Sequence, residues 1–150
     1  MDDNEKIVTM HFCSTLEIDE VDPPSDDFKF PFKTIKEWLI HICTDELPNK
    51  VIDTYNFGLF EGHNIYTLFL NGTNTYRISP DHTQIRTEFS PANMYFSLPE
   101  SEYSGLNREQ VLAYITSKLI EFRKTKTYKN SFFKDARKIN IEWNGDIWSK

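Results

Sequence analysis

The stretch of sequence that decides the fold reads IYTLFLNG over residues 65–72. Its first six residues are apolar on both faces of an extended strand. Strands that are covered on both faces lie inside a sheet, so we expect this strand to be central. The dipeptide Asn71-Gly72 then gives the strongest short-range signal of a β-hairpin, because both positions of a type I′ turn need a positive φ. The sequence therefore predicts a hairpin turn here and a returning strand over residues 75–78.

Further strands are predicted on both sides of this segment, from alternating apolar and polar residues and from the turn signals between them. The strands cover residues 6–14, 52–60, 84–89, 94–98 and 139–143, with turns at 61–64, 80–82, 90–93 and 144–145. Because short turns join antiparallel neighbours, these connections predict an antiparallel meander. We expect the meander to contain about five or six strands.

A helix is predicted over residues 33–46. Apolar side chains recur there at the spacing i, i+3, i+4 and i+7, which forms one stripe along a helix. The stripe consists of Ile35, Trp38, Leu39 and Ile42. Thr34 and Glu37 have the spacing of a capping box at the N-terminus. Pro48 ends the helix, because the residue before a proline is pushed out of the α region.

A second helix is predicted to begin at Asn107, with Gln110 at the matching position of a capping box. Its apolar face consists of Val111, Leu112, Ile115, Leu119 and Phe122. Two helices packed on one face of an antiparallel sheet define an α+β fold. The 150 residues suit a single domain over residues 1–150, because most domains have about 100–200 residues and no linker-like stretch divides the chain.

Nothing in the sequence indicates a membrane segment or a secretion signal. No run of about 18 apolar residues is present, and the first five residues, MDDNE, are acidic, whereas a secretory signal starts with positive charge. We therefore expect a cytoplasmic protein without a membrane partner. Cys13 and Cys43 form no CxxC motif and are expected to be reduced thiols. The sequence leaves open whether the two cysteines lie near each other.

Charge is divided unevenly along the chain. The net charge of −6 combines 14 acidic and 5 basic residues in 1–62 with 9 acidic and 12 basic residues in 63–150. Six carboxylates, two adjacent prolines and no cation occupy residues 17–27, so this segment is expected to be an exposed loop. Seven cations against one acid occupy residues 123–138. We interpret them as an exposed helix end and loop without direct nucleic-acid contact, because an overall negative chain repels phosphate.

Sequence signatures of catalysis are missing. The chain has none of the motifs GxxxxGK[ST], GxGxxG, HExxH and GxSxG, and no Cys/His spacing that is typical of a zinc site. We therefore expect no catalytic residue, no cofactor and no metal. Two alternatives stay open, which are an adaptor in a multiprotein assembly and a small enzyme or ligand-binding domain. Its pocket would lie on a concave sheet face lined by Tyr55, Phe57 and Tyr66, with His63 or His82 as the polar group.

The whole-chain pattern resembles the immunity proteins of bacterial polymorphic-toxin and contact-dependent growth inhibition systems. The pattern combines an N-terminal strand, a helix around IKEWL at 35–39, strands through YNFGLF at 55–60, a late helix and the ending IEWNGDI at 141–147. The resemblance implies an antitoxin rather than an enzyme. Such a protein binds the C-terminal domain of a cognate toxin and neutralises it by stoichiometric protein–protein inhibition.

The resemblance also implies the chemistry of the partner. Such toxin domains are often basic nucleases, and carboxylates that imitate phosphates match their cations. We therefore expect the toxin contacts in the acidic segment at 17–27. The candidate contact residues are Glu17, Asp19, Glu20, Asp22, Asp26 and Asp27. Neither the identity of the toxin nor the oligomeric state of the chain follows from the sequence.

Overall fold

The fold was analysed in a computed structural model, which describes residues 16–18, 21–25, 30–62, 65–143 and 145–149. The elements in chain order are β1 (Leu16–Ile18), α2 (Ile35–Asp45), β2 (Thr54–Gly62), β3 (Ile65–Ser79), β4 (His82–Phe89), β5 (Tyr95–Ser97), α3 (Glu100–Tyr103), α4 (Arg108–Arg123), α5 (Lys126–Lys129), the 3₁₀ helix η1 (Phe132–Asp135), β6 (Lys138–Ile141) and β7 (Gly145–Ser149). The strand expected over residues 6–14 lies outside the described residues.

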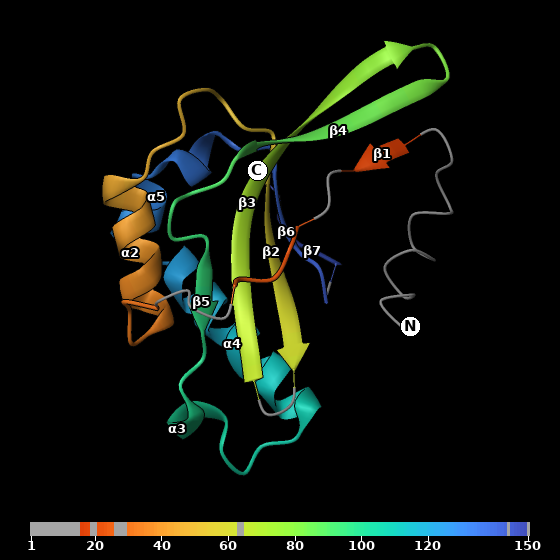
Figure 1. The fold of residues 1–150 in the computed structure, drawn as a ribbon. Coiled ribbons are helices and arrows are strands. Elements are labelled where there is room, and N and C mark those ends of the chain that lie inside the picture. The colour runs from red at the N-terminus through yellow and green to blue at the C-terminus, as the bar shows by residue number, and fades with distance from the viewer. Residues whose placement is uncertain (1–15, 19–20, 26–29, 63–64, 144, 150) are drawn as a thin grey trace.

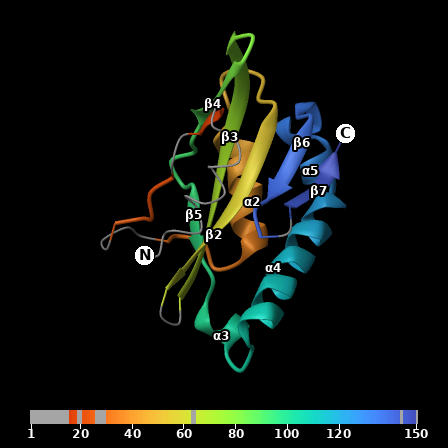
Figure 2. The ribbon, with the colours of Figure 1, turned by 90° about the vertical axis from the view of Figure 1, so that its right-hand side faces the viewer.

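The described strands form one sheet of seven strands in the order β1-β4-β3-β2-β6-β7, with β5 also paired to β3. The predicted α+β class is confirmed, and β2, β3 and β4 form an antiparallel meander. The pure meander of five or six strands is wrong, because β1 pairs with β4 and β6 pairs with β2 in parallel. Parallel neighbours need a long crossover. The chain from β2 to β6, which includes α4, provides one, and the chain from β1 to β4, which includes α2, provides the other (Figures 1 and 2).

The predicted hairpin turn at Asn71-Gly72 is wrong, because β3 continues through both residues to Ser79. Asn71 is 3% exposed, and its side-chain oxygen accepts a hydrogen bond from Asn56 Nδ2 at 3.0 Å. Gly72 lies where a Cβ would come within 2.7 Å of Ile52 Cγ2. Inside the sheet, Asn71 therefore forms a polar side-chain pair and Gly72 allows close packing. The chain turns later, at residues 80–81.

The two predicted helices are confirmed as α2 and α4, and they lie on the same face of the sheet (Figures 1 and 2). Thr34 caps α2 by accepting a hydrogen bond from the Glu37 amide, and Asn107 and Gln110 form a complete capping box on α4. The described chain has more than the two expected helices, because α3, α5 and η1 are also present. These extra helices are only four residues each, too short to show an apolar period in the sequence.

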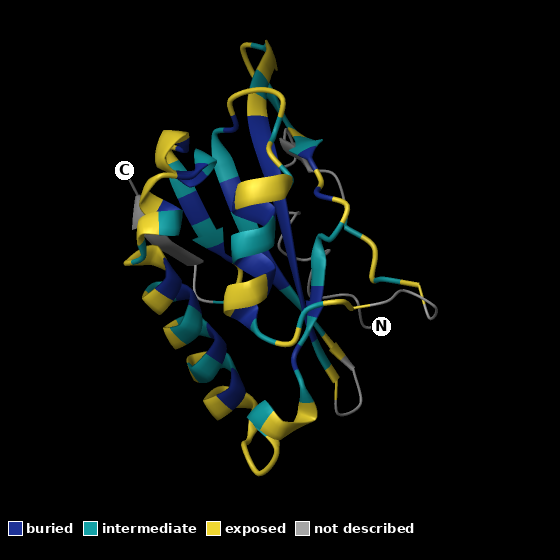
Figure 3. Cartoon of the chain, turned by 90° about the vertical axis from the view of Figure 1, so that its left-hand side faces the viewer, coloured by how far each residue is buried: buried dark blue, intermediate teal, exposed yellow. Residues whose placement is uncertain are grey.

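The core lies between the helices and the sheet, where Figure 3 shows the buried side of each element. Trp38 of α2 is fully buried and stacks on Phe96 of β5 at a centroid distance of 5.6 Å. Tyr55 of β2 packs edge-on against Phe133 of η1 at 4.9 Å. Aromatic pairs of this kind add about 0.5–1.5 kcal/mol each to ordinary apolar burial. Much of the aromatic content of the chain is thus used in the core.

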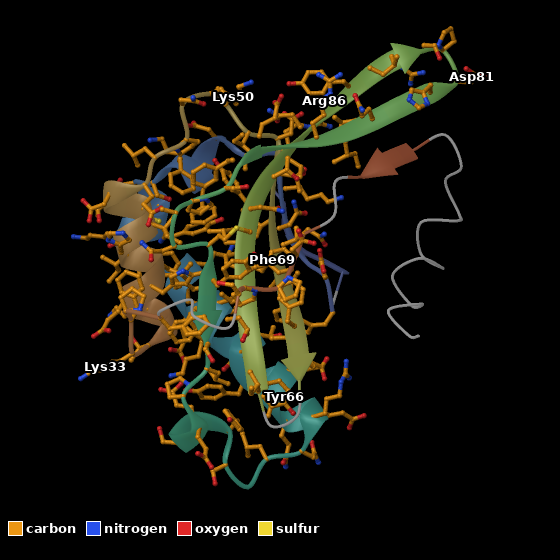
Figure 4. The ribbon with its side chains drawn as sticks, in the orientation of Figure 1. Lys33, Lys50, Tyr66, Phe69, Asp81 and Arg86 are labelled. Carbon is orange, nitrogen blue, oxygen red and sulfur yellow. The ribbon has the colours of Figure 1, made fainter. Side chains whose placement is uncertain are left out.

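The sheet face away from the helices carries a polar row and an aromatic contact. Asn140, Asn56 and Asn71 are linked across β6, β2 and β3 by side-chain hydrogen bonds of 3.3 and 3.0 Å. Phe69 of β3 lies opposite Gly58 of β2 in the register (Figure 4). A Cβ at position 58 would overlap the Phe69 ring, so the glycine is required by this close approach.

Candidate protein-interaction site

An open hollow of about 630 Å³ lies at the C-terminal end of α2. It is bounded by the helix end, by the connection to β2 and by residues 88–93, which follow the end of β4. Its main polar side chains are His41, Asp45, Glu46, Glu88 and Asn93. Three of these five are carboxylates, so we call this feature the acidic hollow.

His41 is held between two carboxylates in the acidic hollow. Its Nδ1 lies 3.2 Å from Asp45 Oδ2, and its Nε2 lies 2.9 Å from Glu46 Oε2. Both ring nitrogens are therefore engaged. A general base needs a free nitrogen within hydrogen-bond reach of the proton that it removes. The arrangement favours a structural clamp over catalysis by His41.

Glu46 fixes the wall of the acidic hollow that follows β4. Its carboxylate accepts hydrogen bonds from the Asn93 amide N–H at 3.2 Å and from the Asn93 side chain at 2.8 Å. The Glu46 side chain is only 12% exposed, whereas Asp45 is 65% exposed. Glu46 is thus a positioning group, and Asp45 is the carboxylate that is open to a partner.

The position of these acids on α2 is electrostatically unfavourable. The C-terminal end of a helix carries partial negative charge, which favours cations there. The last turn of α2 contains no Lys or Arg, and Asp45 and Glu46 stand at its end. A cation supplied by a partner would relieve this repulsion, so the helix end is suited to bind a basic group.

Glu88 enters the acidic hollow because of a β-bulge. Gly72 pairs with Phe89 and Thr73 with Thr87, which leaves Glu88 as the extra residue of β4. A bulge changes the direction of the side chain at that position. Glu88 accepts hydrogen bonds from the Tyr76 hydroxyl and from Asn74 Nδ2.

The hydrogen-bond partners of Glu88 stabilise the charged form of its carboxylate. The hydrogen bond from Tyr76, followed by that from Asn74, lowers the pKa of Glu88 below its ordinary value. The same contact raises the pKa of Tyr76, because Glu88 holds the phenolic proton. Lys50 Nζ lies 3.5 Å from Glu88. Glu88 is therefore a charged and oriented carboxylate at neutral pH.

The predicted toxin-binding segment is only partly described. Glu17 lies in β1, opposite Gln84 of β4. Asp22 is exposed, and its backbone carbonyl accepts a hydrogen bond from the Tyr95 hydroxyl. Asp19, Glu20, Asp26 and Asp27 lie outside the described residues.

The described part of this segment is held on the sheet face away from the helices, where the Tyr95 ring contacts Phe60. Tyr95, which holds Asp22, follows Asn93 by two residues, and Asn93 is bonded to Glu46. The interpretation of the sequence missed Asp45, Glu46 and Glu88. Two adjacent acids at a predicted helix end, where cations are favoured, were the available signal for the first two. No pattern in the residues around Glu88 predicts the bulge.

Of the residues expected to line the alternative aromatic pocket, the described ones do not meet at one open surface. Tyr55 and Phe57 are each 1% exposed and belong to the core, so they cannot line an open pocket. Tyr66 packs against Tyr103 near the start of β3, whereas His82 pairs with Ser79 at its far end. Ser79 lies thirteen positions after Tyr66 along the strand, which is roughly 40 Å at the usual rise. His63 lies outside the described residues.

A second hollow of about 380 Å³ lies between the start of α2 and α4. The Tyr114 hydroxyl donates to Glu102 at 2.8 Å, and Lys118 Nζ stands 5.4 Å from the centre of the Tyr114 ring. Burial, and then the bond to Glu102, raise the pKa of Tyr114 to about 12. The polar side chains of this hollow interact with one another, and Tyr114 stays protonated. The hollow therefore offers little reactive chemistry.

The basic segment at 123–138 covers the end of α4, α5, η1 and the start of β6. Its exposed cations are Arg123, Lys124, Lys126, Lys129, Lys134 and Arg137. Tyr128 and Phe133 point into the core, at 8% and 0% exposure. Proteins that bind single-stranded nucleic acid stack bases on exposed aromatic rings. These two rings are not available for that purpose.

Cysteine and metal chemistry are also limited in the described chain. Cys43 is a free thiol in the core, and burial raises its pKa to about 11, with a small opposing effect of the Ser131 hydroxyl. Cys13 lies outside the described residues. In the part of the chain that the structure describes, no three His, Cys, Asp or Glu side chains are grouped so that they could hold a metal ion.

No protein family, no curated protein and no solved structure was found to match this chain. None of the described helices combines the length and the apolar character that crossing a membrane requires.

Proposed function

We propose that this chain is an immunity protein, which binds a cognate toxin domain and neutralises it by stoichiometric protein–protein inhibition. The observation that carries the proposal is the acidic hollow. Its open carboxylate, Asp45, lies at the negative end of α2 without a Lys or Arg in the last turn. A surface of this kind is matched by a basic protein surface rather than by a small neutral ligand.

Apolar groups beside the acidic hollow support a protein partner. Leu47 lines the hollow and is 63% exposed, and Val51 follows in the same connection at 70% exposure. Protein interfaces combine apolar contact with charges that steer the encounter and set the orientation. Leu47 would supply the apolar contact, and Asp45 and Glu88 the charge.

The partner proposed on this basis is the C-terminal domain of a toxin with a basic nuclease surface. A nuclease must attract phosphates, and carboxylates on an inhibitor satisfy the same cations. The acidic segment at 17–27 would add six further carboxylates to this charge. We therefore extend the proposed contact surface from Glu17, Asp19, Glu20, Asp22, Asp26 and Asp27 to Asp45 and Glu88.

The experiment uses the reading frame next to the gene of this chain. Its C-terminal domain is expressed alone and together with this chain, and both growth and complex formation are measured. Growth arrest by the domain alone, rescue by co-expression and a complex of one copy each support the proposal. Asp45→Asn combined with Glu88→Gln should slow association, most strongly at low salt.

A matched control is Glu109→Gln, which removes one exposed carboxylate from the first turn of α4. It should leave the association rate unchanged. A domain that arrests growth but is neither bound nor counteracted by this chain would overturn the proposal. An equal slowing by the control would show that net charge, and not the acidic hollow, governs the encounter.

A further inference from the structure

The segment 123–138 forms a basic surface around the C-terminal end of α4. Short hydrogen-bonded elements fix its backbone, since Thr125 caps α5 and Ser131 caps η1. The Asp53 carbonyl accepts a hydrogen bond from the Arg137 amide at 2.8 Å, which ties the end of the segment to the start of β2. α5 contacts both α4 and η1, and Figure 2 shows α5 on the side of the molecule where β6 lies. One compact part of the fold therefore carries these cations.

Four cations of this segment are exposed and lack an acidic partner. They are Lys124, Lys126, Lys129 and Arg137. Within the part of the chain that the structure describes, none of the four forms an ion pair. Arg123 and Lys134 are also exposed but already take part in other interactions. We call the four cations without an acidic partner the basic face.

Two lysines of the basic face lie side by side on α5. Lys126 and Lys129 are three positions apart, which places their Cβ atoms about 5–6 Å from each other on a helix. Tyr128 of the same helix faces the core at 8% exposure, so the two lysines are held on the outer side. Like charges this close are unfavourable. A ligand with closely spaced negative charges would relieve the repulsion.

We propose that the basic face binds the phosphate backbone of double-stranded nucleic acid without reading its sequence. Contacts of Lys and Arg with phosphates supply nearly all of the free energy of non-specific binding, and they need exposed cations rather than a pocket. A protein partner fits this surface less well, because the centre of a protein interface is apolar. None of the large apolar side chains that are exposed in the described chain belongs to the segment 123–138.

The aromatic rings beside the basic face favour a duplex over a single strand. Proteins bind single strands by stacking the bases on exposed rings. Tyr128 and Phe133 are buried, and Phe132 is half-buried against Tyr55. A duplex stacks its bases internally and exposes its phosphates, so it can bind to the cations without these rings.

The net charge of −6 was the reason to expect no nucleic-acid contact. Exposed charges are largely screened from each other beyond about 8 Å at physiological ionic strength. Glu88 of the acidic hollow belongs to β4, whereas the segment 123–138 leads into β6. β3 and β2 lie between these two strands, which separates them by about 14 Å at the usual strand spacing, and β1 with Glu17 lies beyond β4. The local positive charge therefore governs binding at the basic face.

The test needs no toxin domain. Fluorescence anisotropy of a short labelled DNA duplex measures the affinity as a function of salt. Each neutralised phosphate contributes about −0.9 to the slope of log K against log salt. Four contacts therefore predict that the affinity falls about 100-fold between 50 and 200 mM salt. A duplex RNA of the same length should show a similar salt dependence, because phosphate contacts do not read the bases.

Variants separate the basic face from the net charge. Lys126→Gln combined with Lys129→Gln should weaken binding about tenfold or more at 50 mM salt, and the fall up to 200 mM should shrink to about tenfold. The matched control is Lys33→Gln combined with Lys36→Gln, which removes two exposed cations at the start of α2. It changes the net charge equally and should bind like the parent. Arginine at positions 126 and 129 keeps the charge and should preserve the affinity.

Four outcomes would overturn the proposal. The first is that the parent chain does not bind the duplex at 50 mM salt. The second is equal weakening by the two glutamine pairs, which would show that net charge governs the encounter. The third is tighter binding of a single strand than of the duplex. The fourth is a polyglutamate chain that displaces the duplex at equal charge concentration, which would assign the basic face to an acidic protein.

Discussion

The indole N–H of Trp38 donates a hydrogen bond of 2.7 Å to the backbone carbonyl of Asn93. Trp38 is fully buried in the core, whereas Asn93 forms part of the acidic hollow. Asn93 also donates twice to Glu46 at the end of α2. Two residues at α2 thus bind the segment between β4 and β5: Trp38 from the core and Glu46 from the hollow. The shape of the hollow depends on this link.

Trp38→Phe tests the link. Phenylalanine keeps an aromatic ring but leaves the Asn93 carbonyl without its donor, so the free energy of unfolding should fall by about 1–3 kcal/mol. Urea unfolding followed by circular dichroism measures the loss. Trp143→Phe is the control, because its N–H bond to Thr116 lies in a half-buried setting and its removal should have a smaller effect. Equal losses for both variants would contradict the structural role given to Asn93.

Local signals in the sequence were sufficient for the two long helices, α2 and α4, and for the turn after β3. The caps at Thr34 and Asn107 involve residues only three positions apart, so the pattern and the structure agree. The Asn71-Gly72 signal failed because the space around Gly72 is filled by Ile52, from the connection before β2, and by Phe89, of β4. A rule for turns cannot include such neighbours. The longer β3 that results pairs with β4 as far as Ser79 and His82.

The candidate site was harder to predict than the fold. The composition of residues 17–27 indicated one acidic segment, and four of its six carboxylates lie outside the described residues. The acidic hollow combines Asp45 with Glu88, which are far apart in the sequence. Glu88 takes part only because of an extra residue in β4, set by the register with β3. Register depends on the whole sheet and is not encoded in the neighbours of Glu88.

Gly58→Ala should destabilise the fold through Phe69. The methyl group would overlap the Phe69 ring, which is 5% exposed and has little room to move. Overpacking of this kind lowers stability by about 1–3 kcal/mol. Gly105→Ala is a useful comparison, because Gly105 has φ +82° but no atom within 4 Å of the added group. Thermal unfolding should show the larger loss for Gly58, and a harmless Gly58→Ala would contradict the close packing.

The pKa of Glu88 predicts a pH dependence of stability. Because its folded pKa is lowered, Glu88 stabilises the fold above its unfolded pKa of about 4.3. This contribution is lost as the pH falls through the folded pKa, where the carboxylate becomes protonated. Glu88→Gln should therefore be less stable than the parent at neutral pH, and the difference should shrink below about pH 4. A difference that is constant with pH would exclude a charged role for Glu88.

Cys43 should be unreactive in the folded chain. The thiolate is the nucleophile, and a buried thiol with a pKa of about 11 is almost fully protonated at neutral pH. A Cys13→Ser variant leaves Cys43 as the single thiol, and alkylation by iodoacetamide can be followed by mass spectrometry. Modification should be slow until denaturant unfolds the chain. Rapid modification under native conditions would show that the core around Cys43 opens readily.

Asp45 and Glu46 should respond to neutralisation in opposite ways. Glu46→Gln weakens two hydrogen bonds to Asn93 in a mostly buried position, so it should reduce stability by about 1–2 kcal/mol. Asp45→Asn removes an unfavourable charge from the negative end of α2, which favours the fold by about 0.3–1 kcal/mol. The lost pair with His41 is exposed and offsets about 0–1 kcal/mol of this gain. The net stability should therefore stay the same or rise slightly.

The role of Asp45 is decided by measuring both the free energy of unfolding and the association rate of the Asp45→Asn variant. If Asp45→Asn leaves the fold as stable as before but slows the association with a basic toxin domain, the carboxylate serves the partner and not the fold. Paired measurements of urea unfolding and association rate on the same variant decide this. A clear loss of stability would instead make Asp45 a structural partner of His41. In that case the open charge at the end of α2 would no longer support a binding surface there.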